Sequence, residues 1–396
     1  MTDTLENVTA TDGGQTRNGA PGVVALDVDA LLADRSVRII VCCGSGGVGK
    51  TTTAAALGLR AAEEHGRRTV VLTIDPARRL AQALGLTELD NTPRQVKGVN
   101  PAAGGELHAM MLDMKRTFDD AVLAHTDARR AEEIFANPFY QAMSSTFSGT
   151  QEYMAMEKLG QLHARGEWDL IVVDTPPSRS ALDFLDAPQR LARFLDGRML
   201  RMLMMPARAG GRSMFNLVTA SFGVFARAVQ KILGGQLLAD LSSFVSGLDT
   251  TFGGFRQRAE RTYRILQAPE TAFLVLAAPE PDAVREAGYF AGRLRRDRMP
   301  LAGLILNRTH RLSTTGIDTE QALAAADALE GGHQATADTL RIHAALASQV
   351  AREARVAERF TRAYPEVPVA AVAAQPADVH DVDGLRDIGA ALTAAA

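Results

Sequence analysis

A glycine-rich run at residues 44–53, Gly-Ser-Gly-Gly-Val-Gly-Lys-Thr-Thr-Thr, constrains the fold of this chain more than any other feature. It fits the pattern G-x-x-x-x-G-K-[ST], follows an apolar run at residues 38–43 and precedes a helix-forming stretch at residues 52–65. A strand, a glycine-rich turn and a helix in this order predict a P-loop, whose backbone N–H groups and helix N-terminus surround phosphate oxygens. The alternative is a glycine-rich turn without a ligand.

Two side chains of this run are expected to have chemical roles. Lys50 is placed to reach the β- and γ-phosphates of a nucleotide, and the hydroxyl of Thr51 to bind Mg²⁺. The other phosphate contacts are expected from the backbone of the loop and of the first helical turn. The predicted nucleotide-binding residues here are Gly46, Gly47, Val48, Gly49, Lys50, Thr51 and Thr52.

Further short apolar runs recur along the chain and predict a sheet. Their residues are apolar at successive positions rather than at alternate ones, which is typical of strands buried on both faces. Because helical patterns separate these runs, we predict an α/β fold with a doubly wound, mostly parallel sheet and its ligand at the carboxyl ends of the strands. A weaker run at residues 107–112 is compatible with an edge strand. The main runs lie at residues 69–74, 169–173, 271–276, 302–306 and 368–372.

The chain has 396 residues, of which 46% are hydrophobic, so it can bury a large core. Residues 1–22 are polar and predict a disordered N-terminal arm. We expect residues 23–396 to form one P-loop domain, with a helical insertion at approximately residues 113–165 and 186–268, where no convincing strand occurs. No stretch reaches the length of about 18 uncharged apolar residues that a spanning helix needs.

Two aspartates end apolar runs where a nucleotide hydrolase needs carboxylates. Asp174 follows residues 171–173, and a carboxylate at the end of a buried strand opposite a P-loop is placed to bind Mg²⁺ through water. Asp75 follows Ile74 and is a candidate to orient the attacking water. Each has an alternative role as a helix cap or turn residue. We predict Lys50, Asp75 and Asp174 as catalytic residues, and Thr51 and Asp174 as the Mg²⁺ site.

The strand at residues 302–306 is followed by Asn307-Arg-Thr-His310. Guanine-specific proteins of this architecture carry Asn-Lys-x-Asp at such a place, and the aspartate that reads guanine is missing here. Since an asparagine amide can pair with the edge of adenine, the sequence favours ATP over GTP. The alternative is that Asn307 is a turn residue.

Charge and cysteine content exclude other classes of function. The formal net charge of −3 gives no electrostatic case for nucleic acid as a partner. The two cysteines, Cys42 and Cys43, are adjacent within the first predicted strand and cannot form a disulfide framework or a C-x-x-C zinc site. They indicate a reducing compartment, so we expect a cytoplasmic protein, with action at the membrane periphery as an open alternative.

With these motifs the chain resembles the arsenite-pump ATPases and the ATPases that target tail-anchored membrane proteins, within the deviant-Walker group of P-loop ATPases. The resemblance rests on residues 44–52, on a first switch at residues 73–77 and on a second at residues 174–185, and it looks closest to the actinobacterial anion-transporter branch. It implies dimerisation across the nucleotides, Mg²⁺ on Thr51 and Asp75 acting on the hydrolytic water. It also implies that Pro376 and Val379, in a late loop, flank adenine.

The chain departs from this family at several positions. Members usually carry a second lysine where this chain has Ser45, and that lysine reaches the partner's nucleotide. A homodimer would lack this cation at both sites, so we hypothesise a heterodimer with a homologous subunit that keeps it. Both cysteines lie in a strand, which makes a thiolate site for arsenite improbable. The switches also differ, with Arg78-Arg79 and Ser180 in place of the usual Asn and His.

The expected insertion is unusually apolar. Residues 213–255 hold six of the fifteen phenylalanines, and methionines cluster just upstream. This composition suits either a groove for hydrophobic helices or ordinary helix packing. The leading prediction is therefore an ATPase whose nucleotide state controls binding of a hydrophobic or membrane-associated partner. The alternatives are a weakly hydrolysing nucleotide-binding regulatory or scaffold subunit, and a small-molecule kinase.

Overall fold

The computed structural model describes residues 24–75, 77, 79–124, 126–137, 140–141, 150–176, 257–314, 316–329 and 332–394. The predicted N-terminal arm at residues 1–22 lies outside these ranges. So do residues 177–256, which contain most of the second switch and the apolar stretch rich in phenylalanine and methionine.

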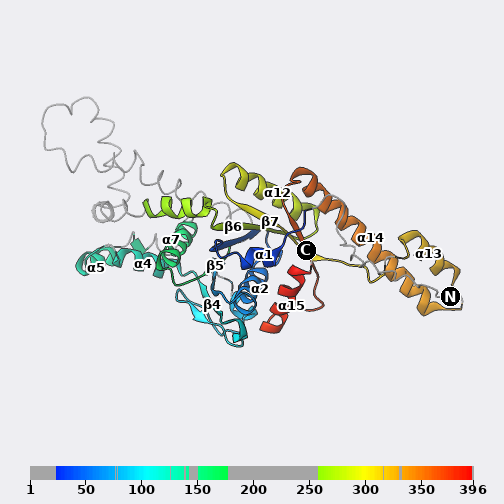
Figure 1. Ribbon diagram of the computed structural model, residues 1–396, viewed down its shortest axis with the longest axis horizontal. Coiled ribbons are helices and arrows are strands. Elements are labelled where there is room, and N and C mark those ends of the chain that lie inside the picture. Colours follow the sequence, from blue (N-terminus) through cyan, green and yellow to red (C-terminus); the bar gives the residue numbers. More distant parts are fainter. Residues whose placement is uncertain are drawn as a thin grey trace, which may run out of the picture.

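An eight-stranded sheet forms the centre of the molecule (Figure 1). The strand order is β3-β4-β2-β5-β1-β6-β7-β8, and every neighbouring pair is parallel except β3 with β4. The prediction of a doubly wound, mostly parallel α/β sheet is confirmed. The strands are β1 (Ile39–Gly44), β2 (Arg68–Thr73), β3 (Arg94–Gln95), β4 (Glu106–Met111), β5 (Leu170–Asp174), β6 (Thr271–Ala277), β7 (Leu301–Thr309) and β8 (Val369–Ala373).

The central strands are buried along their whole length, as their continuous apolar sequences require. Every residue of β1, β5 and β6 is buried. From β1 the chain runs first toward β2 and β4 and later, through β6, toward β7 and β8. The strand order therefore reverses beside β1, and in open α/β sheets the crevice at the carboxyl ends of such strands is where ligands bind.

Helices cover both faces of this sheet (Figure 1). On one face α2 (Lys50–Glu63) packs against β2 and β5 and beside α15 (Val382–Thr393). On the other, α12 (Pro281–Arg296) packs against β6 and beside α14 (Gln334–Ala363). Short elements complete this part of the structure: α1 (Val28–Ala33), α3 (Arg79–Ala83) and the 3-10 turn η1 (Pro101–Ala103).

Helices occupy the described part of residues 113–165, where the first half of an insertion was expected. They are α4 (Met114–Leu123), α5 (Ala128–Ala136) and α7 (Thr150–Arg165), and they lie at one end of the molecule (Figure 1). Phe118 and Tyr140 pack edge to face there, with ring centroids 5.2 Å apart. The division of the chain into a sheet domain and an inserted subdomain stays a prediction.

A helical pair extends from the opposite end, where α13 (Thr319–Ala328) packs along the first part of α14 (Figure 1). Small side chains allow the two helices to approach closely, since Ala322, Ala326, Ala337 and Ala344 are all buried. Within the described residues, no helix is both long and apolar enough to cross a membrane.

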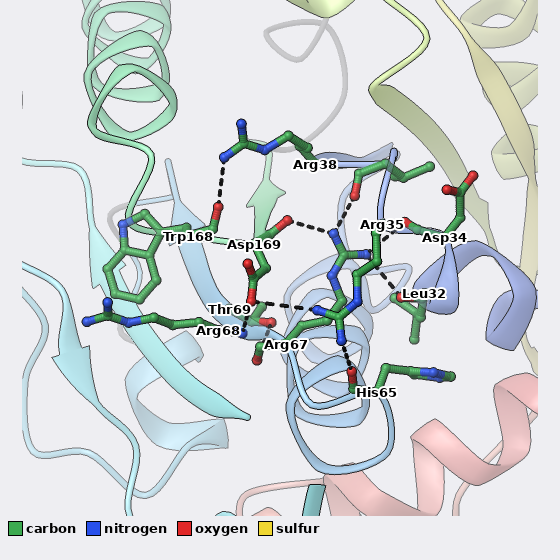
Figure 2. A network of polar contacts seen from close by, with 11 residues as sticks. Leu32, Asp34, Arg35, Arg38, His65, Arg67, Arg68, Thr69, Trp168 and Asp169 are labelled. Carbon is green, nitrogen blue, oxygen red and sulfur yellow. Dashed lines mark hydrogen bonds and ion pairs between the residues drawn. The ribbon is translucent and has the colours of Figure 1, made fainter. Parts of the chain in front are cut away.

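Arg67 joins the amino ends of three strands (Figure 2). Its side chain is fully buried, and its guanidinium donates to the carbonyl oxygens of Val37 before β1, at 2.5 Å, and of Asp169 before β5, at 2.6 Å. It also donates to the carbonyls of Leu32 and Asp34, at 3.0 and 3.2 Å. Buried carbonyl oxygens need hydrogen-bond donors. Here one arginine supplies donors to the carbonyls at the amino ends of the strands, on the side of the sheet away from the P-loop.

Candidate functional site

A cavity of about 830 Å³ opens at the carboxyl ends of the strands, beside the start of α2. Five segments line it: the P-loop with the first turn of α2, Asp75 with part of residues 79–86 after β2, Thr175 after β5, Arg308 in β7 and residues 378–380 after β8. Its size falls in the range of small-molecule sites. The strand ends predicted to converge therefore do enclose one space.

The backbone of the P-loop depends on glycine at both ends. Gly44 has φ of +152°, and a Cβ there would lie 2.2 Å from the carbonyl oxygen of Leu276. Gly49 has φ of +91°, and a Cβ there would lie 2.2 Å from the side-chain nitrogen of Asn307. A larger residue at either position would meet both backbone strain and a steric clash.

Helix α2 begins without a side-chain cap, because its N-cap residue is Gly49. Aspartates cap α1, α4, α5, α13 and α15 by accepting from an N–H group of the first turn. The first-turn N–H groups of α2 thus receive no carboxylate from the N-cap position. The end of the helix macrodipole there is free to attract a phosphate.

Lys50 is 7% exposed and folds back onto its own loop. Its Nζ donates to the carbonyl oxygens of Gly44 at 3.0 Å and Ser45 at 2.7 Å. Burial lowers the pKa of Lys50, while the nearby carboxylates of Asp174 and Asp75 oppose that shift. A cation held against two carbonyls at the cavity wall can exchange those weak partners for phosphate oxygens.

Asp174 is fully buried below the P-loop, where two hydroxyl groups hold one of its oxygens. Thr51 Oγ1 donates to Asp174 Oδ2 at 2.7 Å, and Thr73 Oγ1 donates to the same oxygen at 2.8 Å. The other oxygen, Oδ1, has no hydrogen-bond partner among the described residues. Burial raises the pKa of Asp174 to about 6, although both hydroxyls act in the opposite direction.

This arrangement fits a divalent cation. A buried carboxylate with an unsatisfied oxygen costs free energy, and a nearby cation would offset that cost. Thr51 and Asp174 supply the hydroxyl and carboxylate oxygens that Mg²⁺ prefers, and they lie within hydrogen-bond distance of each other. The donor set is therefore compatible with the predicted metal site.

Asp75 lines the cavity at the end of β2, and its Oδ1 accepts from the N–H group of Ala77 at 3.0 Å. Its own N–H group donates to Thr73 Oγ1 at 3.3 Å, and Thr73 in turn donates to Asp174. Asp75 of the predicted first switch is thereby connected to Asp174 of the predicted metal site through the hydroxyl of Thr73.

The remaining predicted residues lie in different places relative to the cavity. Gly47, Gly49, Thr52 and Val379 line it. Gly46 is exposed in the loop, Val48 is buried beneath it, and Pro376 is exposed but does not line the cavity. Asn307 is 9% exposed and is not among the residues that line the cavity, and its Nδ2 donates to the carbonyl oxygen of Val48 in the loop at 2.8 Å.

Sequence reasoning did not identify several residues of the site. Thr73 begins the predicted first switch but was given no role, and the parallel pairing of β2 and β5, which sets Thr73 in register with Asp174, reveals its contact with that carboxylate. The other lining residues lie in or after strands and α3 and were given no role of their own, although Thr175 belongs to the predicted second switch. They are Arg79, Gln82, Ala83, Gly85, Leu86, Thr175, Arg308, Asp378 and His380.

The sequence profile described as anion-transporting ATPase matches residues 37–319, which is more than half of the chain. The chain belongs to this family. The match begins just before β1 and covers the P-loop, both predicted switch aspartates and Asn307, so most of the residues that line the cavity of this anion-transporting ATPase family member lie within it.

Individual relatives align with part of the chain. ATPase GET3 of Malassezia globosa is 28% identical over 165 residues, covering 42% of this chain and 46% of the relative. Putative arsenical pump-driving ATPase 1 of Aquifex aeolicus is 26% identical over 161 residues, with 38% of each chain covered. An uncharacterized protein of Streptomyces coelicolor, SCO2128, is 33% identical over 180 residues, covering 45% and 43%. The aligned part of the chain thus spans less than half the length of each of these relatives.

The two cysteines of this anion-transporting ATPase family member are poor ligands for soft ions. Both lie in β1, and both are buried. Burial raises the pKa of the Cys43 thiol to about 12 and also raises that of Cys42, so neither forms a thiolate readily. Cys43 Sγ instead lies 3.6 Å from the carbonyl oxygen of Leu274 in β6.

Proposed function

We propose that this protein binds and hydrolyses ATP in the presence of Mg²⁺. The observation that carries the proposal is that three groups lie together at the start of α2. Lys50 is at the cavity wall, Thr51 is the next residue, and Asp174 accepts a hydrogen bond from Thr51 at 2.7 Å. Family membership supports it, because the matched family is one of ATPases. An uncapped helix, a cavity and a paired hydroxyl and carboxylate together suit a phosphate chain with its metal.

Each group has a defined role in this proposal. Lys50 exchanges its two carbonyl partners for phosphate oxygens, and the N–H groups of residues 46–52 donate to the phosphate chain. Thr51 and Asp174 hold Mg²⁺, which when bound neutralises phosphate charge and fixes the geometry of the chain. Asp75, at the cavity wall and connected to Asp174 through Thr73, orients the water that attacks the γ-phosphate.

Adenine is the base that we propose for the nucleotide. The side-chain nitrogen of Asn307 donates to Val48, and no hydrogen bond to its side-chain oxygen occurs within the described residues. An amide oxygen can accept from the 6-amino group of adenine but not from the carbonyl oxygen of guanine. The proposal that Val379 and Pro376 flank the base agrees with the position of Val379 at the cavity.

We further propose that the nucleotide state controls binding of a hydrophobic or membrane-associated partner from the cytoplasm. The resemblance to targeting ATPases and the low charge of residues 213–255 support this. A soft metalloid is disfavoured as cargo, because both cysteine thiols are buried in β1. We propose a heterodimer with a homologous subunit that supplies the lysine missing at Ser45, with a homodimer as the alternative.

The experiment is ATP turnover by the purified full-length chain with Mg²⁺, alone and together with the proteins that co-purify with it. Steady release of phosphate that rises when a co-purifying protein is added supports the proposal. Saturable ATP binding with no turnover in any mixture would instead indicate the second candidate, a regulatory nucleotide-binding subunit, which the serine at position 45 favours. Transfer of phosphate to a small acceptor would indicate a kinase.

A further inference from the structure

Arg308, which lines the cavity, has an unusual backbone conformation. It has φ of +64°, and only Arg298 shares a positive φ among the non-glycine residues in the described part of the chain. Strands β7 and β8 pair Asn307 with Val372 and Thr309 with Ala373, so Arg308 is the extra residue of a β-bulge. Bulges of this kind re-aim a side chain, often next to an active site.

The bulge is held firmly on both sides. Before it, Asn307 Nδ2 donates to the carbonyl of Val48 in the P-loop. After it, Thr309 Oγ1 donates to the carbonyl oxygen of Val372 at 3.1 Å, and His310 contacts Glu353 of α14 through its N–H group at 2.8 Å and its ring at 2.6 Å. A left-handed conformation at a residue with a Cβ persists where surrounding contacts enforce it, and such sites cluster at ligand-binding positions.

The balance of charge in the cavity leaves room for Arg308 to bind phosphate. Arg308 lines the same cavity as Lys50 and Asp75, and its guanidinium has no hydrogen bond or ion pair within the described residues. Lys50 is the cation of the P-loop itself, since Ser45 stands where the family usually has a second one. Arg79 and Arg308 both line the cavity beside Lys50. A triphosphate carries more negative charge than one lysine and one Mg²⁺ balance, and a guanidinium can bind it with two parallel hydrogen bonds.

We propose that Arg308 is a phosphate-binding residue of this nucleotide site, supplied by the same chain through the β7 bulge. The inference rests on the proposed ATP binding and adds to Lys50 a guanidinium for the polyphosphate. The fixed bulge keeps Arg308 in a left-handed conformation that glycine would adopt without strain, and a guanidinium at the cavity gives a reason for arginine at this position.

Substitution by glycine separates this role from a purely structural one. Arg308→Gly removes both the backbone strain and the cation, and Arg298→Gly is its matched control, since Arg298 has φ of +57° at the exposed end of α12 and does not line the cavity. We expect each variant to raise the Tm by up to about 1–2 °C. Arg308→Gly alone is expected to weaken binding of Mg-ATP by about 10- to 100-fold, and Arg308→Lys to weaken it less.

Inorganic tripolyphosphate serves as the second probe in the same calorimetric titration, because it carries phosphates without a base. The proposal expects Arg308→Gly to weaken tripolyphosphate and ATP by similar factors. Equal affinity of wild type and Arg308→Gly for both probes would show a structural bulge only and overturn the proposal. A loss for ATP without a loss for tripolyphosphate would assign Arg308 to the base and also overturn it. A wild-type protein that binds neither probe would overturn the proposed function itself.

Discussion

Thr51 and Asp174 meet with a hydroxyl-to-carboxylate distance of 2.7 Å, although 123 residues separate them in the chain. Thr51 stands in the first turn of α2 and Asp174 at the end of β5, which pairs with β1 immediately before the P-loop. Parallel pairing of these two strands therefore places a hydroxyl and a carboxylate at one point, which is the requirement for a Mg²⁺ site beside bound phosphates.

Asp174→Asn tests this site. The amide oxygen can still accept from Thr51 and Thr73, so the fold is retained, but the negative charge is removed. We expect ATP to bind with little dependence on Mg²⁺, and turnover to fall by about 10²-fold or more. Titration of ATP with and without Mg²⁺ measures the first effect. Asp378→Asn is the control, because Asp378 lines the same cavity but does not contact Thr51. This variant should keep the wild-type dependence of ATP affinity on Mg²⁺. If Asp174→Asn also kept that dependence, the assignment of the Mg²⁺ site would be contradicted.

Ser45→Lys tests the need for a cation from a second subunit. The Ser45 hydroxyl is buried and has no hydrogen-bond partner among the described residues, so the substitution breaks no side-chain hydrogen bond there. A lysine that reaches the partner's phosphates should raise kcat of the purified chain by about 10- to 10³-fold. Ser45→Met provides a side chain of similar length without charge. If the two variants turn over ATP at the same rate, the missing lysine does not limit this enzyme.

Arg67→Met tests the hydrogen-bond network at the amino ends of the strands. Without the guanidinium, the carbonyls of Leu32, Asp34, Val37 and Asp169 lose a donor in a buried setting (Figure 2). We expect the free energy of unfolding to fall by at least about 3 kcal/mol, measured by urea denaturation. Arg68→Met is the control, because the exposed Arg68 lies over the Trp168 ring at 5.1 Å and should contribute about 1 kcal/mol or less. Equal losses in both variants would refute this account of Arg67.

Glu63 makes the free energy of unfolding depend on pH, and the sign of this dependence follows from its contacts. Burial opposes its ionisation, but hydrogen bonds from Arg386, at 2.7 and 3.0 Å, and from the N–H group of Asn100 outweigh burial and lower the pKa of Glu63 below its usual 4.5. A lowered carboxylate pKa stabilises the fold above the unfolded-state pKa, and this stabilisation is lost as pH falls through the folded-state pKa.

Glu63→Gln should therefore reduce the free energy of unfolding by about 1–3 kcal/mol at neutral pH, and by progressively less below about pH 4. Denaturation of both proteins across this range measures the difference. Asp383→Asn removes the exposed partner of the same arginine and should change stability by less than about 0.5 kcal/mol. A constant difference between Glu63→Gln and wild type at all pH values would contradict the assignment.

Much of this structure could be predicted because its residues have local patterns. Continuous apolar runs predicted seven of the strands, and the P-loop spacing predicted the start of α2. The carboxylates at positions 75 and 174 were found because each ends such a run. The antiparallel edge strand β3 was not predicted, since two residues, Arg94 and Gln95, carry no periodicity.

Other features could not be read from sequence because tertiary contacts create them. A charged residue before a strand, such as Arg67, is usually exposed, and only the convergence of three strand ends makes it a buried donor. Arg308 has no local pattern that predicts a positive φ, because the bulge is set by the pairing of β7 with β8. The contact of Thr73 with Asp174 required knowledge that β2 and β5 are neighbours.

Calorimetric titration of Mg-ATP into wild type and Lys50→Ala tests the central claim most directly. We predict a saturable binding heat for wild type and a loss of affinity of at least about 100-fold for Lys50→Ala, with both proteins giving cooperative thermal unfolding. No binding heat with wild type, or equal affinity in the two proteins, would contradict the account.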